Sequence, residues 1–284
     1  MHFLSPLLSS RRLWGLALVI PLAAGLLRAK ETEEPVAVFA QVFNGYTRTR
    51  LPDKSFKPET YTFGEGGCLT RPVTDEAGAE MTFLRVARAV AAPLGRLNYR
   101  PAHTSPEAEL LILVFWGATE GTRGHSDPSG AVSQSGSAVS ATTETAYDDD
   151  ALTSMLASTA DRDRIDYRNA RILGYSEVFD RAKFAAHMSF AQDIMGEVAN
   201  SRYYVVLQAY DFKTAVKEKK LKQLWTARIS MDASGNNFGR SLDQMLQRAA
   251  RYFGQDSDGL HRDLIPEGRI EIGPTKVIEP VPAK

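Results

Sequence analysis

Histidine and acidic side chains are the residues with which an enzyme most often performs acid–base or metal chemistry. The chain has five histidines, and no two of them have the short spacing that metal ligands on one element need. A hydrolytic site would therefore have to be assembled from distant residues, with His125, His187 and the acids around Asp148 as its candidates. The sequence predicts no metal ion and no organic cofactor.

A second set of side chains is suited to binding. Lysines between two predicted strands typically keep a hairpin end soluble, and here they could also contact an anionic lipid or a partner. The aromatic residues of the same strands are expected mainly in the core, although some could line a pocket at the sheet edge. We predict a ligand or partner surface made of Tyr204, Tyr210, Trp225, Lys217, Lys219 and Lys220.

The charge balance excludes one class of partner. Lys and Arg together number 34, as do Asp and Glu, and removal of residues 1–29 would leave a net charge of −3. A protein that follows a phosphate backbone needs a basic surface. The sequence therefore argues against nucleic-acid binding.

Residues 1–29 have the composition of a secretory signal. Arg11 and Arg12 precede the apolar run from Leu13 to Leu27, and Ala29 could stand before a cleavage point. Fifteen residues form a helix of only about 22 Å, shorter than the roughly 30 Å bilayer core. We expect an exported chain in the periplasm or cell envelope. An uncleaved anchor is the alternative, and a mature chain beginning near Lys30 would exclude it.

The lone cysteine, Cys68, bears on how the exported chain could be cross-linked or anchored. A single cysteine cannot form an internal disulfide, and it lies too far from the apolar run to carry a lipid anchor. We expect it to be a small buried residue.

The stretch from Arg202 to Gly254 gives the clearest fold signal. Residues 203–210 and 223–231 are rich in β-branched and aromatic residues, and a lysine-rich connection joins them into a predicted hairpin. The helix that follows has Asn236 or Asn237 as its N-cap and ends at Gly254. One apolar stripe at helical spacing covers the hairpin, and it consists of Phe238, Leu242, Met245, Leu246, Ala249 and Phe253.

Other patterns extend this arrangement along the chain. The run Leu110–Trp116 is apolar on both faces and predicts a central strand. Pro93 is expected to bend or shorten a helix over residues 79–97. Further strands are predicted at 36–43, 61–63 and 269–272, and a tight turn at Asn44-Gly45. Residues 117–147 are predicted to form a flexible Gly/Ser/Thr-rich loop, and residues 273–284 a Pro-containing tail. Two helical segments are predicted within 148–201, the second capped by Ser176.

Two short phrases resemble a domain-of-unknown-function family of exported bacterial envelope proteins, many of them lipoproteins. The first is Tyr99-Arg100-Pro101-Ala102 followed by Glu109-Leu110-Leu111-Ile112, and the second is Leu224-Trp225-Thr226-Ala227 before a final helix. The resemblance covers residues 60–116 and 202–254. It implies a cell-envelope protein and no catalytic residues. This chain differs in lacking the lipid-bearing cysteine and in the roughly 85 residues between the two halves.

These patterns together predict an α+β fold. We expect a mixed or antiparallel sheet packed against helices, formed as one domain by residues 30–116 and 202–272, with a helical insertion at 148–201. The function that we expect is a non-enzymatic binding or assembly module. Its partner would be another envelope protein or a small ligand, and a membrane only if the N-terminal segment is uncleaved. The alternatives are the hydrolase above and a membrane-tethered structural protein.

Overall fold

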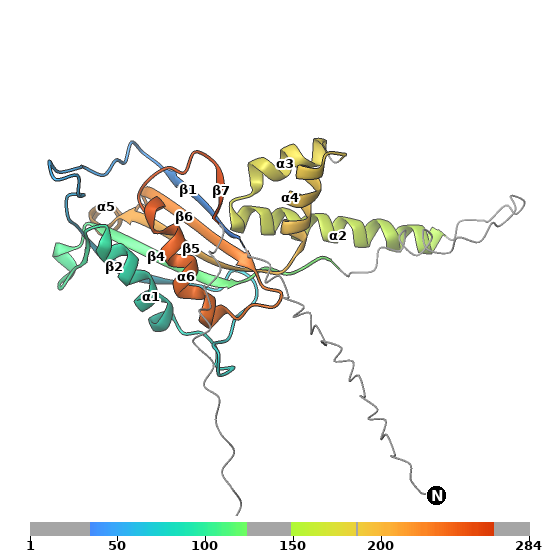
Figure 1. Ribbon diagram of the computed structural model, residues 1–284, viewed down its shortest axis with the longest axis horizontal. Coiled ribbons are helices and arrows are strands. Elements are labelled where there is room, and N and C mark those ends of the chain that lie inside the picture. Colours follow the sequence, from blue (N-terminus) through green and yellow to red (C-terminus); the bar gives the residue numbers. More distant parts are fainter. Residues whose placement is uncertain (1–34, 124–148, 186, 264–284) are drawn as a thin grey trace, which may run out of the picture. The chain divides into compact units, whose positions relative to one another are not determined.

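The computed structural model describes residues 35–123, 149–185 and 187–263 (Figure 1). These residues form one sheet in the order β3-β2-β4-β5-β6-β1-β7. β2 is parallel to β3 and β4, and the other neighbours are antiparallel. The strands are β1 (Val36–Val42), β2 (Glu59–Gly67), β3 (Tyr99–Pro101), β4 (Leu110–Ala118), β5 (Arg202–Asp211), β6 (Gln223–Asp232) and β7 (Leu260–Asp263). The prediction of a mixed or antiparallel sheet is confirmed, and the sheet is mixed.

The helices fall into two groups by their place in the sequence. The insertion between β4 and β5 contains three of them, which confirms the predicted helical insertion. The six α-helices of the described residues are α1 (Phe83–Arg96), α2 (Asp149–Leu173), α3 (Ser176–Phe184), α4 (Ser189–Ala199), α5 (Phe212–Glu218) and α6 (Phe238–Ala249). Within the described ranges, none of these helices has both the length and the apolar composition needed to cross a membrane.

One face of the sheet packs against α1 and α6. β4 lies between β2 and β5, as expected for a strand that is apolar on both faces. The predicted stripe of α6 is buried against β6, where the Trp225 ring stacks on Phe253 at 6.2 Å between centroids. This first core contains Val38, Val90, Leu94, Ile112, Val114, Leu207, Trp225, Ile229, Met245 and Phe253.

The opposite face carries a second core, which the insertion helices cover. It joins β1 and β5 to α2, α3 and α4 through Ala37, Leu173, Phe179, Ala182, Ile194, Val198, Tyr204 and Val206. A polar cluster at its border joins α4 to β5 and β7, because Glu197 lies 3.6 Å from Arg202 and 3.1 Å from Arg262. Consecutive residues of β1 and β5 therefore serve different cores.

Several expectations are corrected. The connection after β5 forms the short helix α5, whose N-cap is Asp211. The insertion has three helices where two were predicted, because the chain turns after Phe184 and re-enters a helix at Ser189. Ser176 is the first helical residue and Tyr175 the N-cap. α1 continues through Pro93 to Arg96, so the proline does not end the helix early, although it removes one backbone N–H and crowds the carbonyl four residues earlier.

The ends of the elements also differ from the predictions. β4 continues to Ala118, so two residues of the predicted flexible loop are ordered as strand. The unpredicted β7 pairs with β1 at the edge of the sheet. Asn237 caps α6 as expected, and the chain reaches Gly254, which has a φ of +73°, through a 3-10 turn at Ala250–Tyr252. The predicted signal peptide, residues 124–147 of the predicted flexible loop, the strand at 269–272 and the tail lie outside the described residues.

Candidate functional site

The insertion helices cover only part of the second sheet face. Farther along β4, β5 and β6, the side chains of this face are half-buried. Strand register places them together, because Leu111 pairs with Tyr210 and Leu113 with Gln208, while Arg228 pairs with Val206. Directly paired residues of antiparallel strands point to the same face. We call these residues, Leu111, Leu113, Gln208, Tyr210 and Arg228, the open sheet face.

Arg228 is the unusual member of this surface. It lies in the middle of a strand whose neighbours are mostly buried, and burial lowers the pKa of its guanidinium. The shift does not discharge it, since arginine stays protonated in proteins. Among the described residues, no acid or hydrogen-bond acceptor is paired with it. A half-buried cation without a counter-charge has a net desolvation cost.

Two other buried arginines show what the fold normally supplies. The Arg48 guanidinium lies 3.7 Å from Glu59, and its Nη1 donates to the Leu97 carbonyl oxygen at 2.7 Å. Arg202 lies beside Glu197 and donates from Nε to the Ser230 hydroxyl at 3.3 Å. Although Arg48 Nε and Arg202 Nη2 have no hydrogen-bond partner among the described residues, both arginines have an acid nearby that offsets part of the cost of burial. Arg228 lacks one in the part of the chain that the structure describes.

Gln208 and Tyr210 complete a group of donors around Arg228. The Tyr210 hydroxyl donates to Gln208 Oε1 at 2.9 Å, which leaves the Gln208 amide N–H groups without an acceptor among the described residues. Burial raises the pKa of Tyr210, and Arg228 partly offsets this effect. Donors therefore outnumber acceptors on this surface, beside the aliphatic side chains of Leu111 and Leu113. This chemistry suits a ligand that has an anionic group and an apolar part.

The predicted binding residues are divided by the structure. Tyr204 and Trp225 are both fully buried, Tyr204 in the second core and Trp225 in the first, so neither belongs to an exposed surface. The reason is that the insertion helices cover the second sheet face at Tyr204, while α6 covers the first sheet face at Trp225. Tyr210 belongs to the open sheet face. Its neighbours Gln208 and Arg228 were missed, although an arginine within an otherwise buried strand was a usable signal.

The predicted lysines lie at the end of β5. Lys217 is in the last turn of α5, and Lys219 and Lys220 follow it; all three are exposed. α5 begins at Phe212, directly after the strand that carries Tyr210. The lysines therefore belong to the same end of the sheet as Tyr210, and their role in binding stays a prediction.

The tyrosine of the second core has a different role. Tyr204 Oη accepts a hydrogen bond from the Leu69 backbone N–H at 2.9 Å and lies 3.9 Å from Cys68 Sγ. It therefore fixes the segment after β2 to the sheet. Cys68 itself is exposed, which corrects the expectation of a buried thiol. Cys68 directly follows the glycine-rich end of β2.

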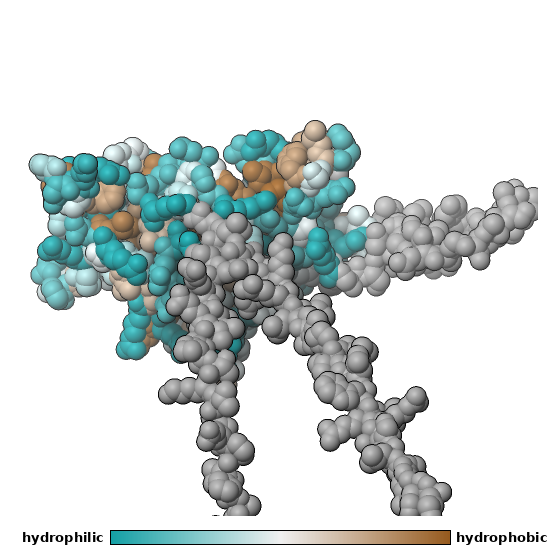
Figure 2. Space-filling model, viewed as in Figure 1, coloured by the Kyte–Doolittle hydropathy of each residue, from teal (hydrophilic) through white to brown (hydrophobic). Residues whose placement is uncertain are grey.

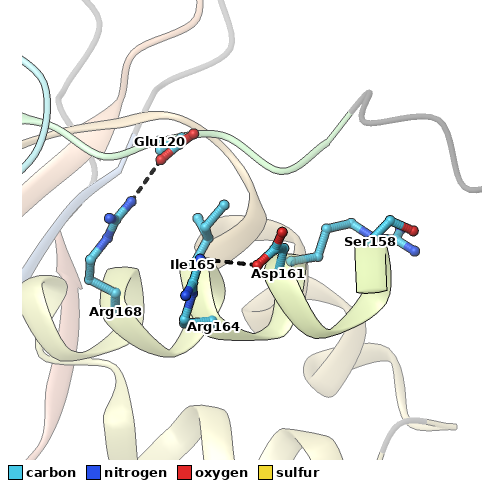
Figure 3. Close-up of a pocket in the computed structure, with 7 residues that line it drawn as sticks. Glu120, Ser158, Asp161, Arg164, Ile165 and Arg168 are labelled. Carbon is cyan, nitrogen blue, oxygen red and sulfur yellow. Dashed lines mark hydrogen bonds and ion pairs between the residues drawn. The ribbon is translucent and has the colours of Figure 1, made fainter. Parts of the chain in front are cut away.

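A second concave surface lies between α2 and the segment after β4 (Figure 3). This pocket of about 630 Å³ is lined mainly by charged residues. Most of its charge is paired internally, because Arg168 Nη2 lies 2.8 Å from Glu120 and Arg164 Nη2 lies 3.0 Å from Asp161. These pairs are exposed and are worth little individually. Because the charges within each of these two described ion pairs compensate each other, we place no ligand site there.

An apolar surface lies at the turn between α3 and α4. Figure 2 shows hydrophobic residues gathered over these helices, and the exposed fraction is 93% for Phe184 and about half for Met188 and Phe190. These side chains have no hydrogen-bonding group that would define a ligand, so we place no site there.

The residues proposed for hydrolysis are not brought together in the described chain. His187 is exposed in the turn before α4, whereas His125 and Asp148 lie outside the described residues. Within the described ranges, no three His, Cys, Asp or Glu side chains are placed to hold a metal ion. Comparison with known protein families and with curated proteins finds no match for this chain. The resemblance stated from the two short phrases therefore stays a hypothesis.

Proposed function

We propose that this protein is an exported, non-enzymatic binding module that holds an anionic small ligand on the open sheet face. The export part of the proposal is supported by the composition of residues 1–29. The binding part is supported by the one observation that Arg228 is half-buried beside Tyr210 and Gln208 and has no counter-charge among the described residues.

A bound anion would supply what the fold lacks at Arg228. A carboxylate or phosphate can accept two parallel N–H bonds from a guanidinium, and the Gln208 amide offers a further donor. Leu111 and Leu113 provide apolar contact beside this polar centre. A ligand with an anionic head and a short alkyl part would satisfy both components.

The test compares Arg228→Gln with the parent protein in calorimetric titrations of octanoate, octyl phosphate and uncharged octyl glucoside. We expect the parent to bind the two anions and Arg228→Gln to bind them at least tenfold more weakly, as expected for loss of a charge-assisted hydrogen bond. Arg228→Lys should keep part of the affinity, because lysine retains the charge but not the bidentate geometry. Arg96→Gln, at an exposed arginine in the last turn of α1 on the other side of the sheet, is the matched control and should bind as the parent does.

The free energy of unfolding distinguishes a binding role of Arg228 from a structural role. Removal of an unpaired, half-buried charge should leave the free energy of unfolding unchanged or slightly higher. Arg228→Gln would contradict the proposal if it were destabilised by more than about 1 kcal/mol, or if it bound the anions as well as the parent does. Absence of anion binding to the parent would also overturn it.

A further inference from the structure

One side of β2 is left without a strand partner over most of its length. β3 pairs only with Glu59, Thr60 and Tyr61, and the strand continues to Gly67. On its other side, β2 pairs with β4 from Tyr61 onward. Among the described residues, no strand lies beside residues 62–67 on the β3 side.

The backbone direction along β2 identifies the unpaired groups. The Glu59 N–H donates to the Asn98 carbonyl oxygen and the Tyr61 carbonyl accepts from the Ala102 N–H, both on the β3 side. The Thr60 carbonyl accepts from Glu109 on the β4 side. Because backbone groups alternate along a strand, those of Phe63 and Glu65 also point to the β3 side. No described residue pairs with them there, which makes this a template for strand addition.

A groove runs beside this edge. It has a volume of about 270 Å³ and lies between β2 and α1, lined mainly by apolar side chains. Phe63 belongs to β2, Leu84, Ala87 and Ala91 belong to α1, and Leu84 is 56% exposed. A side chain that projects from an added strand toward α1 would enter this groove.

Charge narrows the choice of partner. Glu65 is exposed, shares the α1 side of β2 with Phe63, and has no ion-pair partner among the described residues. Two copies of this chain paired through this edge would bring like charges together on adjacent strands. A peptide with a basic residue at this position would pair with Glu65 instead.

We propose that the free edge of β2 takes up an extended peptide segment as an added strand. The peptide backbone pairs with Phe63 and Glu65, an apolar side chain occupies the groove beside Leu84, and a Lys or Arg two residues away faces Glu65. The site is short, because β3 limits one end and the glycine-rich bulge at Glu65/Gly67 limits the other. It does not depend on the anion site at Arg228.

The test selects a phage-displayed library of random 12-residue peptides on the parent protein after depletion on Glu65→Pro. Proline removes the outward N–H but no bond to β4, since position 65 donates away from β4. We expect enrichment of alternating sequences that contain a basic residue. The labelled peptide should bind Glu65→Pro at least tenfold more weakly in fluorescence anisotropy, and Glu65→Ala, which keeps the N–H, only a few-fold more weakly.

Further variants keep the test decisive. Ala91→Phe fills the groove from α1 without changing β2, and it should also weaken binding at least tenfold even if Glu65→Pro folds poorly. Arg228→Gln should bind the peptide as the parent does, which separates this site from the proposed anion site. No enriched sequence, or equal binding to Ala91→Phe and the parent, would overturn the proposal. If the parent sediments as a dimer and Glu65→Pro as a monomer, the added strand comes from a second copy of the chain. That result would also overturn the proposal of a peptide partner.

Discussion

At the scale of single residues, the partners of a buried polar group decide its role. Arg48 and Arg202 are each buried beside a glutamate, and their contacts hold segments of the fold together. Arg228 has the same chemistry in a site without an acid among the described residues. The inference of a binding site therefore comes from the missing partner and not from the residue type.

Tyr204 gives a prediction on pH. Burial raises the pKa of its hydroxyl to about 12, above the value of about 10 expected in the unfolded chain. The unfolded state therefore loses its proton first, so this stabilising contribution is complete below pH about 10 and is lost as pH rises toward about 12. Between pH about 9 and about 11, the free energy of unfolding should fall by about 1 kcal/mol more in the parent than in Tyr204→Phe.

Denaturant titrations of both proteins at several pH values measure this difference. Tyr204→Phe should be less stable than the parent at neutral pH, because it loses the hydrogen bond from the Leu69 N–H. Parallel curves for the two proteins over the alkaline range would contradict the assignment.

At the scale of elements, the turn between α2 and α3 packs closely against β1, which connects the insertion to the sheet. Gly174, between α2 and α3, has a φ of +81°, and a Cβ atom there would lie 2.6 Å from the Phe39 Cβ on β1. Gly235, between β6 and α6, has a similar φ of +73° but open space around its Cα. A comparison of the same substitution at these two glycines therefore distinguishes the cost of backbone strain from the cost of steric contact.

Gly174→Ala should therefore destabilise the protein more than Gly235→Ala. Both alanines face a left-handed backbone cost of about 1–2 kcal/mol. Gly174→Ala should add about 1–3 kcal/mol, because Phe39 or the α2–α3 turn must move. Urea denaturation of the two variants measures the difference in stability. Equal midpoints would show that Phe39 can move away from an alanine at position 174 at no measurable cost.

At the scale of the whole molecule, the sheet is shared by two cores. Val205 and Leu207 of β5 belong to the first core, while Tyr204 and Val206 belong to the second. Because the same strands line both cores, loss of packing on one face should weaken the other. We therefore expect the insertion to unfold together with the sheet.

Tryptophan fluorescence tests this cooperativity. Trp116 and Trp225 both lie in the first core, whereas Phe179 lies in the second. Phe179→Leu should lower the free energy of unfolding by about 1–2 kcal/mol, with the same midpoint shift in tryptophan fluorescence and in far-UV circular dichroism. Ile229→Val in the first core is the matched control and should also shift both signals together. A shift in dichroism alone for Phe179→Leu would mean that the insertion unfolds separately.

The sequence by itself determined the elements that have a strong period. The alternation in β6, the apolar run of β4 and the stripe of α6 follow from local geometry, since each pattern matches one regular structure. The Asn237 cap and the Asn44-Gly45 turn, which has positive φ at both residues, were readable for the same reason. Short elements such as β7 and α5 were missed because pairing and end contacts, rather than periodicity, stabilise them.

Only the tertiary structure decided which surfaces stay open. The aromatic residues Tyr204 and Trp225 look alike in sequence to Tyr210, yet the insertion covers the first and α6 the second. Arg228 and the β2 edge became candidate binding sites only from the strand order. It shows that, among the described residues, no acid pairs with Arg228 and no strand pairs with the β3 side of β2 beyond Tyr61. A side chain's partners come from distant segments, so its role depends on long-range contacts that no local pattern contains.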